Sequence, residues 1–387
     1  WLGNDDSLQP RSRESLDIQT KATLERNAGN INDFANSIRA MRRHEIERIG
    51  LAWMSGVIDD EASLAGMTDV YDAAIEASLQ WAIQHRINDI QIDEAPAAIA
   101  IIGMGRYGGR EVNFSSDADV IIIYRPAEGA DDDQANLFAR KVQEDLRAIL
   151  QGPTTFEPKI ELDMDLRPEG KNGPLVRSYA SCEEYYRSWA STWEHQALLR
   201  ARYAAGDASL AEDFLMNIAD PLRYPKIDLT ETQIAEIRKL KARMEAERLP
   251  RGVRRDRHLK LGKGGLSDVE WTIQLLQLQH AGDNANLRVN GTLQALNELE
   301  HRKLISAGDA VVLRKAWRMC TAARNGSYLW SGRVNQADIL PDDSYSLGGI
   351  AVYLGYDANR GQHFENDLLA VIRKARDVTE RLFYGRS

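Results

Sequence analysis

Residues 97–124 read AAIAIIGMGRYGGREVNFSSDADVIIIY, and this stretch decides the fold. Two apolar, strand-like runs flank a glycine-rich turn, and Asp117 and Asp119 stand at the start of the second run. Side chains two residues apart on a strand point to the same face, so both carboxylates project together beside the glycines. Two like charges that close are costly unless a cation neutralises them. The pattern therefore predicts half of a Mg²⁺ site next to a phosphate-binding turn.

The same stretch contains a competing motif. Residues 103–108 match G-x-G-x-x-G after a strand-like run, as in dinucleotide-binding folds. Such a fold needs a helix and a crossover of a dozen or more residues before the next parallel strand. Only residues 109–116 separate the last glycine from Asp117, and they make a poor helix. We therefore interpret the two runs as neighbouring strands joined by a short excursion that holds a ligand.

The composition is that of an ordinary globular chain. Its 387 residues, 43% of them hydrophobic and 28% charged, allow two or three domains. We expect no membrane span, because no window approaches 18 uninterrupted apolar residues, and no secretory signal. A first residue other than Met suggests a fragment or a processed chain.

Net charge and cysteine content exclude further kinds of protein. A net charge of −9 argues against a general nucleic-acid binder. The two cysteines, Cys182 and Cys320, form neither a disulfide framework nor a metal set. They fit a reducing cytoplasm, where we expect both to be buried small hydrophobic residues.

Patterning divides the chain into three parts, which together predict an α+β fold. Residues 1–94 and 207–387 carry apolar residues at helical spacing, with short turn-forming clusters between the helices. Residues 95–206 predict a small α/β unit with strands over 97–104, 119–124 and 159–166 and helices over 131–150 and 182–204. The acidic run at 131–133 is typical of a helix start, where the helix dipole favours acids, rather than of a metal site.

A second acidic strand is expected at residues 159–168. Glu161, Asp163 and Asp165 alternate there with apolar residues, so one face carries three carboxylates. Taken alone, this pattern favours a solvated outer face. Beside Asp117 and Asp119 it instead offers a third acid, as a pair of metal ions about 4 Å apart would require.

Candidate phosphate-binding groups surround these acids. Polyphosphate recognition uses guanidinium forks and backbone amides. The candidates are Gly105 and Arg106 in the glycine turn, Ser116 before the acid pair, and Arg167, Lys171 and Arg177 after the third acid. Each basic residue taken alone is more often a solvated surface charge.

The assembly resembles the polymerase-β-like nucleotidyltransferase superfamily, whose signature is a strand, a small glycine motif, about ten residues and an acid-x-acid pair. Here Gly105-Arg106 is followed by ten residues and then by Asp117-Ala118-Asp119, and Asp163 is similar to the third acid of that superfamily. The resemblance implies a polymerase-β-like sheet domain flanked by helices. It also implies two Mg²⁺ ions held by the three acids, with ATP as substrate and a hydroxyl as nucleophile.

Four motifs in order make the resemblance more specific. Residues 103–119, 162–176, 193–202 and 260–280 together resemble the glutamine synthetase adenylyltransferase family from residue 98 to the end, in an actinobacterial form. Members carry two nucleotidyltransferase halves: one adds AMP to a tyrosine of glutamine synthetase and the other removes it by phosphorolysis. This chain has one such half, which resembles the C-terminal, AMP-adding one, and the family implies regulation by the PII signalling protein and glutamine.

The resemblance leaves some residue roles open. Many members have Arg two residues after the third acid, where this chain has Asp165, so Arg167 would have to supply the phosphate contact of that Arg. Asp163 is the expected third ligand, and whether it or Asp165 faces the metals stays open. In the third motif, Glu194, Arg200 and Arg202 are expected on one helix, either packing or contacting substrate. In the fourth, Asp268 is expected to cap a helix that begins near Leu266; alternatively, this loop, with Lys260 and Lys263, approaches the nucleotide or the acceptor tyrosine.

Two other functions compete with AMP transfer to glutamine synthetase. One is uridylylation of a PII-type protein, although such enzymes usually carry His-Asp metal motifs that this sequence lacks. The other is a catalytically silent regulatory or interaction module, against which a complete acidic triad argues.

Overall fold

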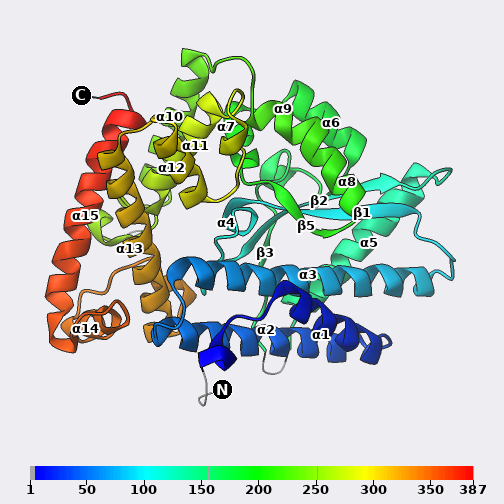
Figure 1. Ribbon diagram of the computed structural model, residues 1–387. Helices are drawn as coiled ribbons and strands as arrows, with labels where there is room; N and C mark the ends of the chain where they lie inside the picture. The colour runs from blue at the N-terminus through cyan, green and yellow to red at the C-terminus, as the bar shows by residue number, and fades with distance from the viewer. Residues whose placement is uncertain (1–4, 155–156, 251, 387) are drawn as a thin grey trace. The chain divides into compact units, whose positions relative to one another are not determined.

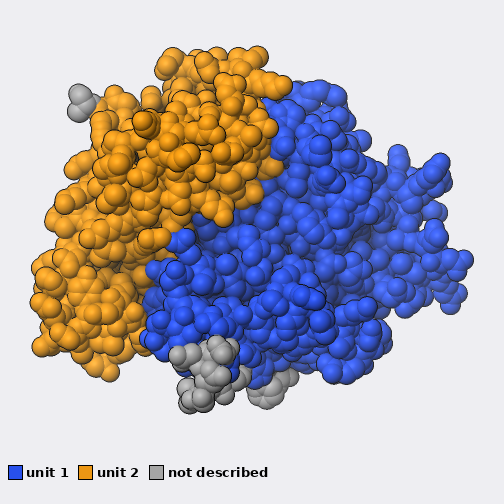
Figure 2. All heavy atoms as spheres, viewed as in Figure 1, with its two compact units in different colours: residues 1–222 blue, residues 223–387 orange. Residues whose placement is uncertain are grey.

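The computed structural model describes residues 5–154, 157–250 and 252–386. The chain forms two compact units, residues 1–222 and residues 223–387 (Figure 2). The N-terminal helices and the sheet therefore share one unit. The division into residues 1–94, 95–206 and 207–387 stays a prediction.

Helices precede the sheet, as the sequence predicted. After a short 3₁₀ turn (η1, Asp5–Leu8) come α1 (Arg13–Arg26), α2 (Ile31–Met54) and α3 (Asp60–Asp89) (Figure 1). The side chains of Ser12, Asn30 and Asp59 accept N–H groups of the first turns of these three helices. These caps satisfy backbone donors that have no partner within a helix.

The sheet is mixed and centres on β2. Its order is β3-β2-β1-β5, and β4 pairs with β2 on the same edge as β3. β1 and β5 run antiparallel to their neighbours, whereas β3 and β4 run parallel to β2. The strands are β1 (Ala97–Gly103), β2 (Ala118–Pro126), β3 (Leu162–Asp163), β4 (Val176–Ser178) and β5 (Arg202–Gly206). Antiparallel pairing of β1 with β2 confirms that the glycine motif is not a dinucleotide crossover, and the α+β prediction is confirmed.

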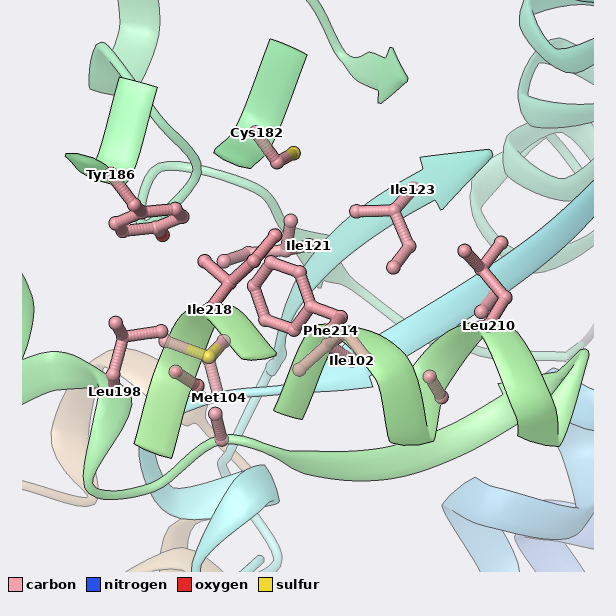
Figure 3. Close-up of a cluster of buried hydrophobic side chains, with 14 residues drawn as sticks. Ile102, Met104, Ile121, Ile123, Cys182, Tyr186, Leu198, Leu210, Phe214 and Ile218 are labelled. Carbon is pink, nitrogen blue, oxygen red and sulfur yellow. The ribbon is translucent and has the colours of Figure 1, made fainter. Parts of the chain in front are cut away.

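Both faces of the sheet are covered. Ile102, Ile121 and Ile123 pack against Phe214 and Tyr186 in a buried cluster (Figure 3). α5 (Asp132–Gln151) contacts β1 and β2. Residues of these strands that alternate with Ile102, Ile121 and Ile123 point to the other face of the sheet, and Ile101, Val120 and Ile122 are buried there as well. Asp119 lies two and four residues before Ile121 and Ile123 on β2, so its side chain points to the same face of the sheet as theirs, away from α5.

The acidic run before α5 is a helix start, as predicted. The Asp131 side chain accepts the Gln134 N–H at 3.0 Å, and Asp132 and Asp133 lie in the first turn. Cys182 is buried in the cluster of Figure 3, where burial raises the pKa of its thiol to about 12, and Cys320 is buried as well. Both cysteines are free, as expected for buried hydrophobic residues.

Two of the secondary-structure predictions were wrong. The strand expected over 159–166 is only the two residues of β3, because the chain leaves the edge of β2 after Asp163 and turns at Glu169, whose φ is +64°. The helix expected over 182–204 is instead α6 (Tyr179–Ser188), α7 (Thr192–Leu198) and β5. A capping box on Ser191 starts α7, and β5 ends in the pairing with β1.

The remaining helices complete the two units. In the first unit they are α4 (Gly105–Gly108), η2 (Gly170–Asn172), α8 (Ala208–Asp213) and η3 (Phe214–Ala219); α9 (Asp220–Arg223) ends the unit. The second unit contains α10 (Glu231–Glu247), η4 (Arg255–Arg257), α11 (Leu266–His280), η5 (Ala285–Leu287), α12 (Thr292–His301), α13 (Ala307–Ser331), η6 (Val334–Gln336), α14 (Ser344–Tyr353), η7 (Ala358–Arg360) and α15 (Gly361–Leu382). Within the described ranges, no helix has the length and apolar character needed to cross a bilayer.

Candidate active site

Asp119 and Asp163 are register partners on two parallel strands, β2 and β3. Neighbouring strands lie about 4.8 Å apart, and registered side chains point to the same face. Asp117, two residues before Asp119, is exposed at the entrance to β2. The fold therefore brings the three predicted acids to one corner of the sheet.

Asp163 differs from Asp165 in its surroundings. Asp163 is partly buried and its Oδ1 accepts the Asp165 N–H at 2.7 Å. Burial raises the pKa of the Asp163 carboxyl above its ordinary value, and the charges of Asp165 and Asp117 raise it further, against the opposing effects of the Asp165 N–H and Lys171. Asp165 is exposed in the following turn, where Lys171 Nζ lies 3.2 Å from its Oδ2. The backbone thus favours Asp163 as the partner of the acid pair.

The glycine turn closes directly against Asp119. The Met104 N–H donates to the Asp119 carbonyl at 2.8 Å, and Gly105 follows with φ of +52°. A Cβ atom built on Gly105 would overlap Oδ2 of Asp119. Glycine is therefore required here both for its positive φ and for the close approach of the carboxylate.

Ser116 and Arg106 lie on the same excursion between β1 and β2. The Ser116 hydroxyl donates to Asn113 Oδ1 at 2.6 Å and accepts the Asn113 N–H at 3.1 Å, so it shapes the turn before Asp117. Arg106 is partly buried in α4, and its carbonyl accepts the Glu111 N–H at 2.8 Å. Both predicted nucleotide-binding residues thus lie within the segment that joins the glycines to the acid pair.

Arg167 lies in different surroundings from those predicted. Its side chain is buried and donates to the carbonyls of Met164 at 2.7 Å, Gly173 at 3.0 Å and Lys171 at 3.2 Å. A guanidinium engaged with three backbone carbonyls has few donors left for a ligand. This geometry favours a structural role in the loop after β3 over the predicted phosphate contact.

The donor chemistry at this corner suits Mg²⁺, which prefers carboxylate oxygens and keeps part of its water shell. In the described portion of the chain, however, no three His, Cys, Asp or Glu side chains are arranged closely enough to hold a metal ion. The fit therefore rests on three carboxylates at one corner and on the raised pKa of Asp163, a cost that a bound cation would relieve.

The charged residues of the third motif point inward and belong to different elements. Glu194 is the N3 residue of the α7 capping box, and burial raises the pKa of its carboxyl. Arg200 lies 3.4 Å from Glu111, with both side chains buried. Arg202, on β5, pairs with Asp72 of α3. These residues pack the unit, and the prediction that they share one helix was wrong.

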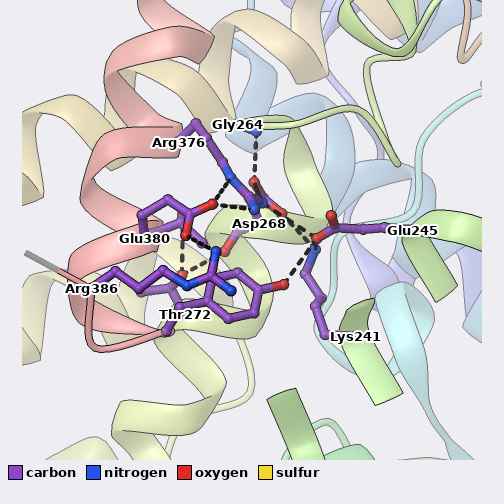
Figure 4. Close-up of polar contacts among 10 residues, drawn as sticks. Lys241, Glu245, Gly264, Asp268, Thr272, Arg376, Glu380 and Arg386 are labelled. Atoms are coloured by element: carbon purple, nitrogen blue, oxygen red, sulfur yellow. Dashed lines mark hydrogen bonds and ion pairs between the residues drawn. The ribbon is translucent and has the colours of Figure 1, made fainter. Parts of the chain in front are cut away.

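The fourth motif forms a buried ion cluster in the second unit (Figure 4). Asp268, fully buried in the first turn of α11, accepts the Gly264 N–H at 2.6 Å. Its carboxylate also pairs with Lys241 and, at 2.9 Å, with Arg376. The helix expected near Leu266 begins there, with Asp268 in its first turn. Among the described residues no side chain caps its N-terminus, and Asp268 instead belongs to a larger charge network.

Sequence reasoning missed the α3 residues that contact the active-site segment, Tyr71 and Asp72 among them. Tyr71 and Asp72 lie on α3, in the helical region before the sheet, and both are buried. The Tyr71 hydroxyl donates to the Ser116 carbonyl at 3.0 Å. The available signal was polar residues next to apolar ones along this helix, which indicates buried polar groups but not their partners.

Comparison with known families agrees with this geometry. The profile of glutamate-ammonia ligase adenylyltransferase matches residues 2–217, which contain all three acids. The profile of GlnD PII-uridylyltransferase matches residues 237–383 of the helical second unit.

Curated relatives match along the whole chain. A Bifidobacterium longum (strain DJO10A) protein is 77% identical over 387 residues, which are 100% of this chain and 36% of the relative. A Mycobacterium avium (strain 104) protein is 41% identical over 97% of the chain and 38% of its own length. Both are named bifunctional glutamine synthetase adenylyltransferase/adenylyl-removing enzyme. The chain spans little more than a third of the length of these relatives, and it belongs to the glutamate-ammonia ligase adenylyltransferase family.

Proposed function

We propose that this chain transfers AMP from ATP to a tyrosine hydroxyl of glutamine synthetase. The observation that carries the proposal is the register pairing of Asp119 with Asp163 beside the Gly105 turn, in a chain of this family. The names of the relatives supply the acceptor, because they specify glutamine synthetase.

In this proposal the glycine turn receives the nucleotide. Backbone N–H groups near Gly105, with Arg106 and Ser116, would contact the triphosphate. Gly105 brings the backbone within reach of the Asp119 carboxylate, so phosphate oxygens bound at the turn would lie next to the acids. Arg167 would act indirectly, by fixing the loop that follows Asp163.

Asp117, Asp119 and Asp163 would hold Mg²⁺, with two ions expected from the superfamily resemblance. When bound, the metal supplies Lewis-acid charge neutralisation at the phosphates. The protein's own contribution is to hold three carboxylates in fixed positions, which the β2–β3 register provides for two of them.

Asp163 is the candidate base. As a carboxylate it can accept a proton, and the β2–β3 register holds it beside Asp119. Its Oδ1 is engaged by the Asp165 N–H, so Oδ2 would take the tyrosine proton. The tyrosine oxygen then bonds to the α-phosphorus, and the bond from that phosphorus to the β-phosphate oxygen breaks. AMP-tyrosine and pyrophosphate are the products.

The wider biology is proposed on the same basis. The chain would correspond to the C-terminal, AMP-adding part of a bifunctional enzyme that also removes AMP by phosphorolysis. A PII signalling protein is the proposed regulatory partner, and the match of the second unit to a GlnD PII-uridylyltransferase profile makes that unit the first place to look. A cytoplasmic location fits the two buried free thiols.

One experiment separates this function from its competitors. The protein is incubated with Mg²⁺, purified glutamine synthetase and ATP labelled on the α-phosphate. We expect label on a glutamine synthetase tyrosine, and no label when the γ-phosphate carries it. The variant with both Asp117→Asn and Asp119→Asn should fold and transfer nothing. Persistent transfer by this variant would overturn the assignment of the acids. Label from UTP on a PII protein, with none on glutamine synthetase, would establish the uridylyltransferase instead.

A further inference from the structure

One face of α3 contacts the segment that carries the active-site turn. Thr68, Asp69, Tyr71 and Asp72 follow one another at helical spacing, and each has a polar contact with residues 107–116 or with the strand beside them. We call these four residues the α3 clamp.

The clamp holds the end of the segment next to the acid pair. The buried Tyr71 hydroxyl donates to the carbonyl of Ser116, the residue before Asp117, at 3.0 Å. Arg42 of α2, itself buried, donates from Nη2 to the same hydroxyl at 2.7 Å. A hydroxyl that accepts from a guanidinium is a stronger donor, because linked hydrogen bonds polarise one another. Arg42 and Tyr71 therefore fix the peptide from which Asp117 projects.

The clamp also holds the glycine end of the segment. Asp72 is 2% exposed and binds the Arg202 guanidinium in a fork, with distances of 2.8 and 3.1 Å. Arg202 then donates to the Tyr107 carbonyl at 3.1 Å, and its guanidinium lies 4.8 Å from the centre of the Tyr107 ring. Tyr107 belongs to α4, which directly follows the close approach of Gly105 to Asp119.

Stability alone is a weak reason for these contacts. A buried ion pair stabilises a fold little compared with apolar packing, although it fixes geometry well. Here the buried polar groups converge on the two ends of one segment, residues 104–117, which sets the positions of Asp117 and Asp119.

We propose that the α3 clamp, with Arg42, positions the carboxylates of the active site from a helix outside the sheet. Tyr71 and Asp72 are positioning residues: they act through Ser116, Arg202 and Tyr107 on Asp117 and Asp119. The inference deepens, and for its catalytic consequence rests on, the proposed AMP transfer.

The test compares two tyrosines in the full chain. Tyr71→Phe removes the hydroxyl that binds Ser116; the matched control, Tyr124→Phe, removes the hydroxyl on β2 that accepts from Asn136 at 2.8 Å. With no ligand present, we expect amide hydrogen exchange of residues 113–119 to become about 10-fold faster in Tyr71→Phe and to stay unchanged in the control. In AMP transfer, kcat should fall about 10- to 100-fold in Tyr71→Phe, with a smaller change in KM for ATP.

A second variant, Arg202→Lys, keeps the charge but loses the fork, and it should speed exchange at residues 105–109. Equal exchange and equal kcat in Tyr71→Phe and Tyr124→Phe would overturn the inference. Absence of AMP transfer in the unmodified chain would instead overturn the proposed function, while the exchange comparison would still decide whether α3 positions the segment.

Discussion

Asp119 on β2 is the register partner of Asp163 on β3, whereas Asp165 lies in the turn beyond the strand and donates its N–H to Asp163. Two carboxylates two residues apart in sequence therefore have different environments. One faces the acid pair from a neighbouring strand, and the other is exposed beside Lys171.

This difference predicts unequal effects of removing each charge. Asp163→Asn should lower the rate of AMP transfer at least about 100-fold, because it removes both a proposed ligand and the proposed base. Asp165→Asn should lower the rate less than about 10-fold, since its backbone N–H still donates to Asp163. Steady-state transfer to glutamine synthetase, with circular dichroism as a folding control, measures both. A larger loss in Asp165→Asn would assign the third acid to Asp165.

The close approach of Gly105 to Asp119 predicts a steric effect on activity. Gly105→Ala adds a methyl group where the Asp119 carboxylate lies, so the carboxylate must move and transfer should fall at least about 100-fold.

Gly129→Ala is the matched control for that variant. Gly129 also has a positive φ, +76°, but a Cβ there meets no atom within 4 Å. Both variants carry the backbone strain of alanine at positive φ, of about 1 kcal/mol. If Gly129→Ala loses as much activity as Gly105→Ala, strain rather than displacement of Asp119 is the cause.

The elements that were predicted correctly are those that local sequence patterns determine, and the errors concern elements that depend on pairing with distant parts of the chain. β1, β2 and the Asp131 cap follow from apolar runs and from helix-start chemistry, which nearby residues determine. β5 was hidden because its Tyr-Ala-Ala sequence continues the helical pattern before it, and only pairing with β1 makes it a strand. The Asp72–Arg202 pair joins residues 130 positions apart, so no local window could reveal it.

The buried cluster around Asp268 predicts a large effect on stability. Asp268→Asn would remove the fully buried carboxylate that Lys241 and Arg376 share and would leave them the more exposed Glu245 and Glu380. We expect the free energy of unfolding to fall by about 3–5 kcal/mol, because a buried charge then lacks its buried partner. Glu245→Gln removes a more exposed member of the same cluster and should cost less. Urea unfolding followed by tryptophan fluorescence measures both. Equal losses would show that burial of Asp268 does not set the cost.

His258 predicts how the stability of the second unit depends on pH. The ring is buried, and its Nδ1 accepts the Leu261 N–H at 3.1 Å, which requires that Nδ1 carry no proton. Burial lowers the pKa of His258, in part against the nearby Asp338 charge, which raises it. In the unfolded chain the pKa returns to about 6.5. Below that pH the unfolded chain binds a proton on His258 and the folded protein does not. The free energy of unfolding therefore falls as the pH falls.

We therefore expect the contribution of His258 to the free energy of unfolding to be constant above about pH 7. It should decline from about pH 6.5 down to the lowered pKa of His258 in the folded protein. His258→Gln should flatten that decline, because glutamine does not titrate. His363→Gln is the matched control in the same unit, since its ring is 54% exposed. The comparison uses urea unfolding of the three proteins between pH 5 and pH 8, at constant ionic strength. A slope that survives in His258→Gln and disappears in His363→Gln would assign the titration to the exposed ring instead.

The same contact predicts an effect on amide exchange. The His258 ring accepts the Leu261 N–H at the start of the glycine turn before α11, so loss of that contact in His258→Gln is expected to speed amide exchange at residues 261–265.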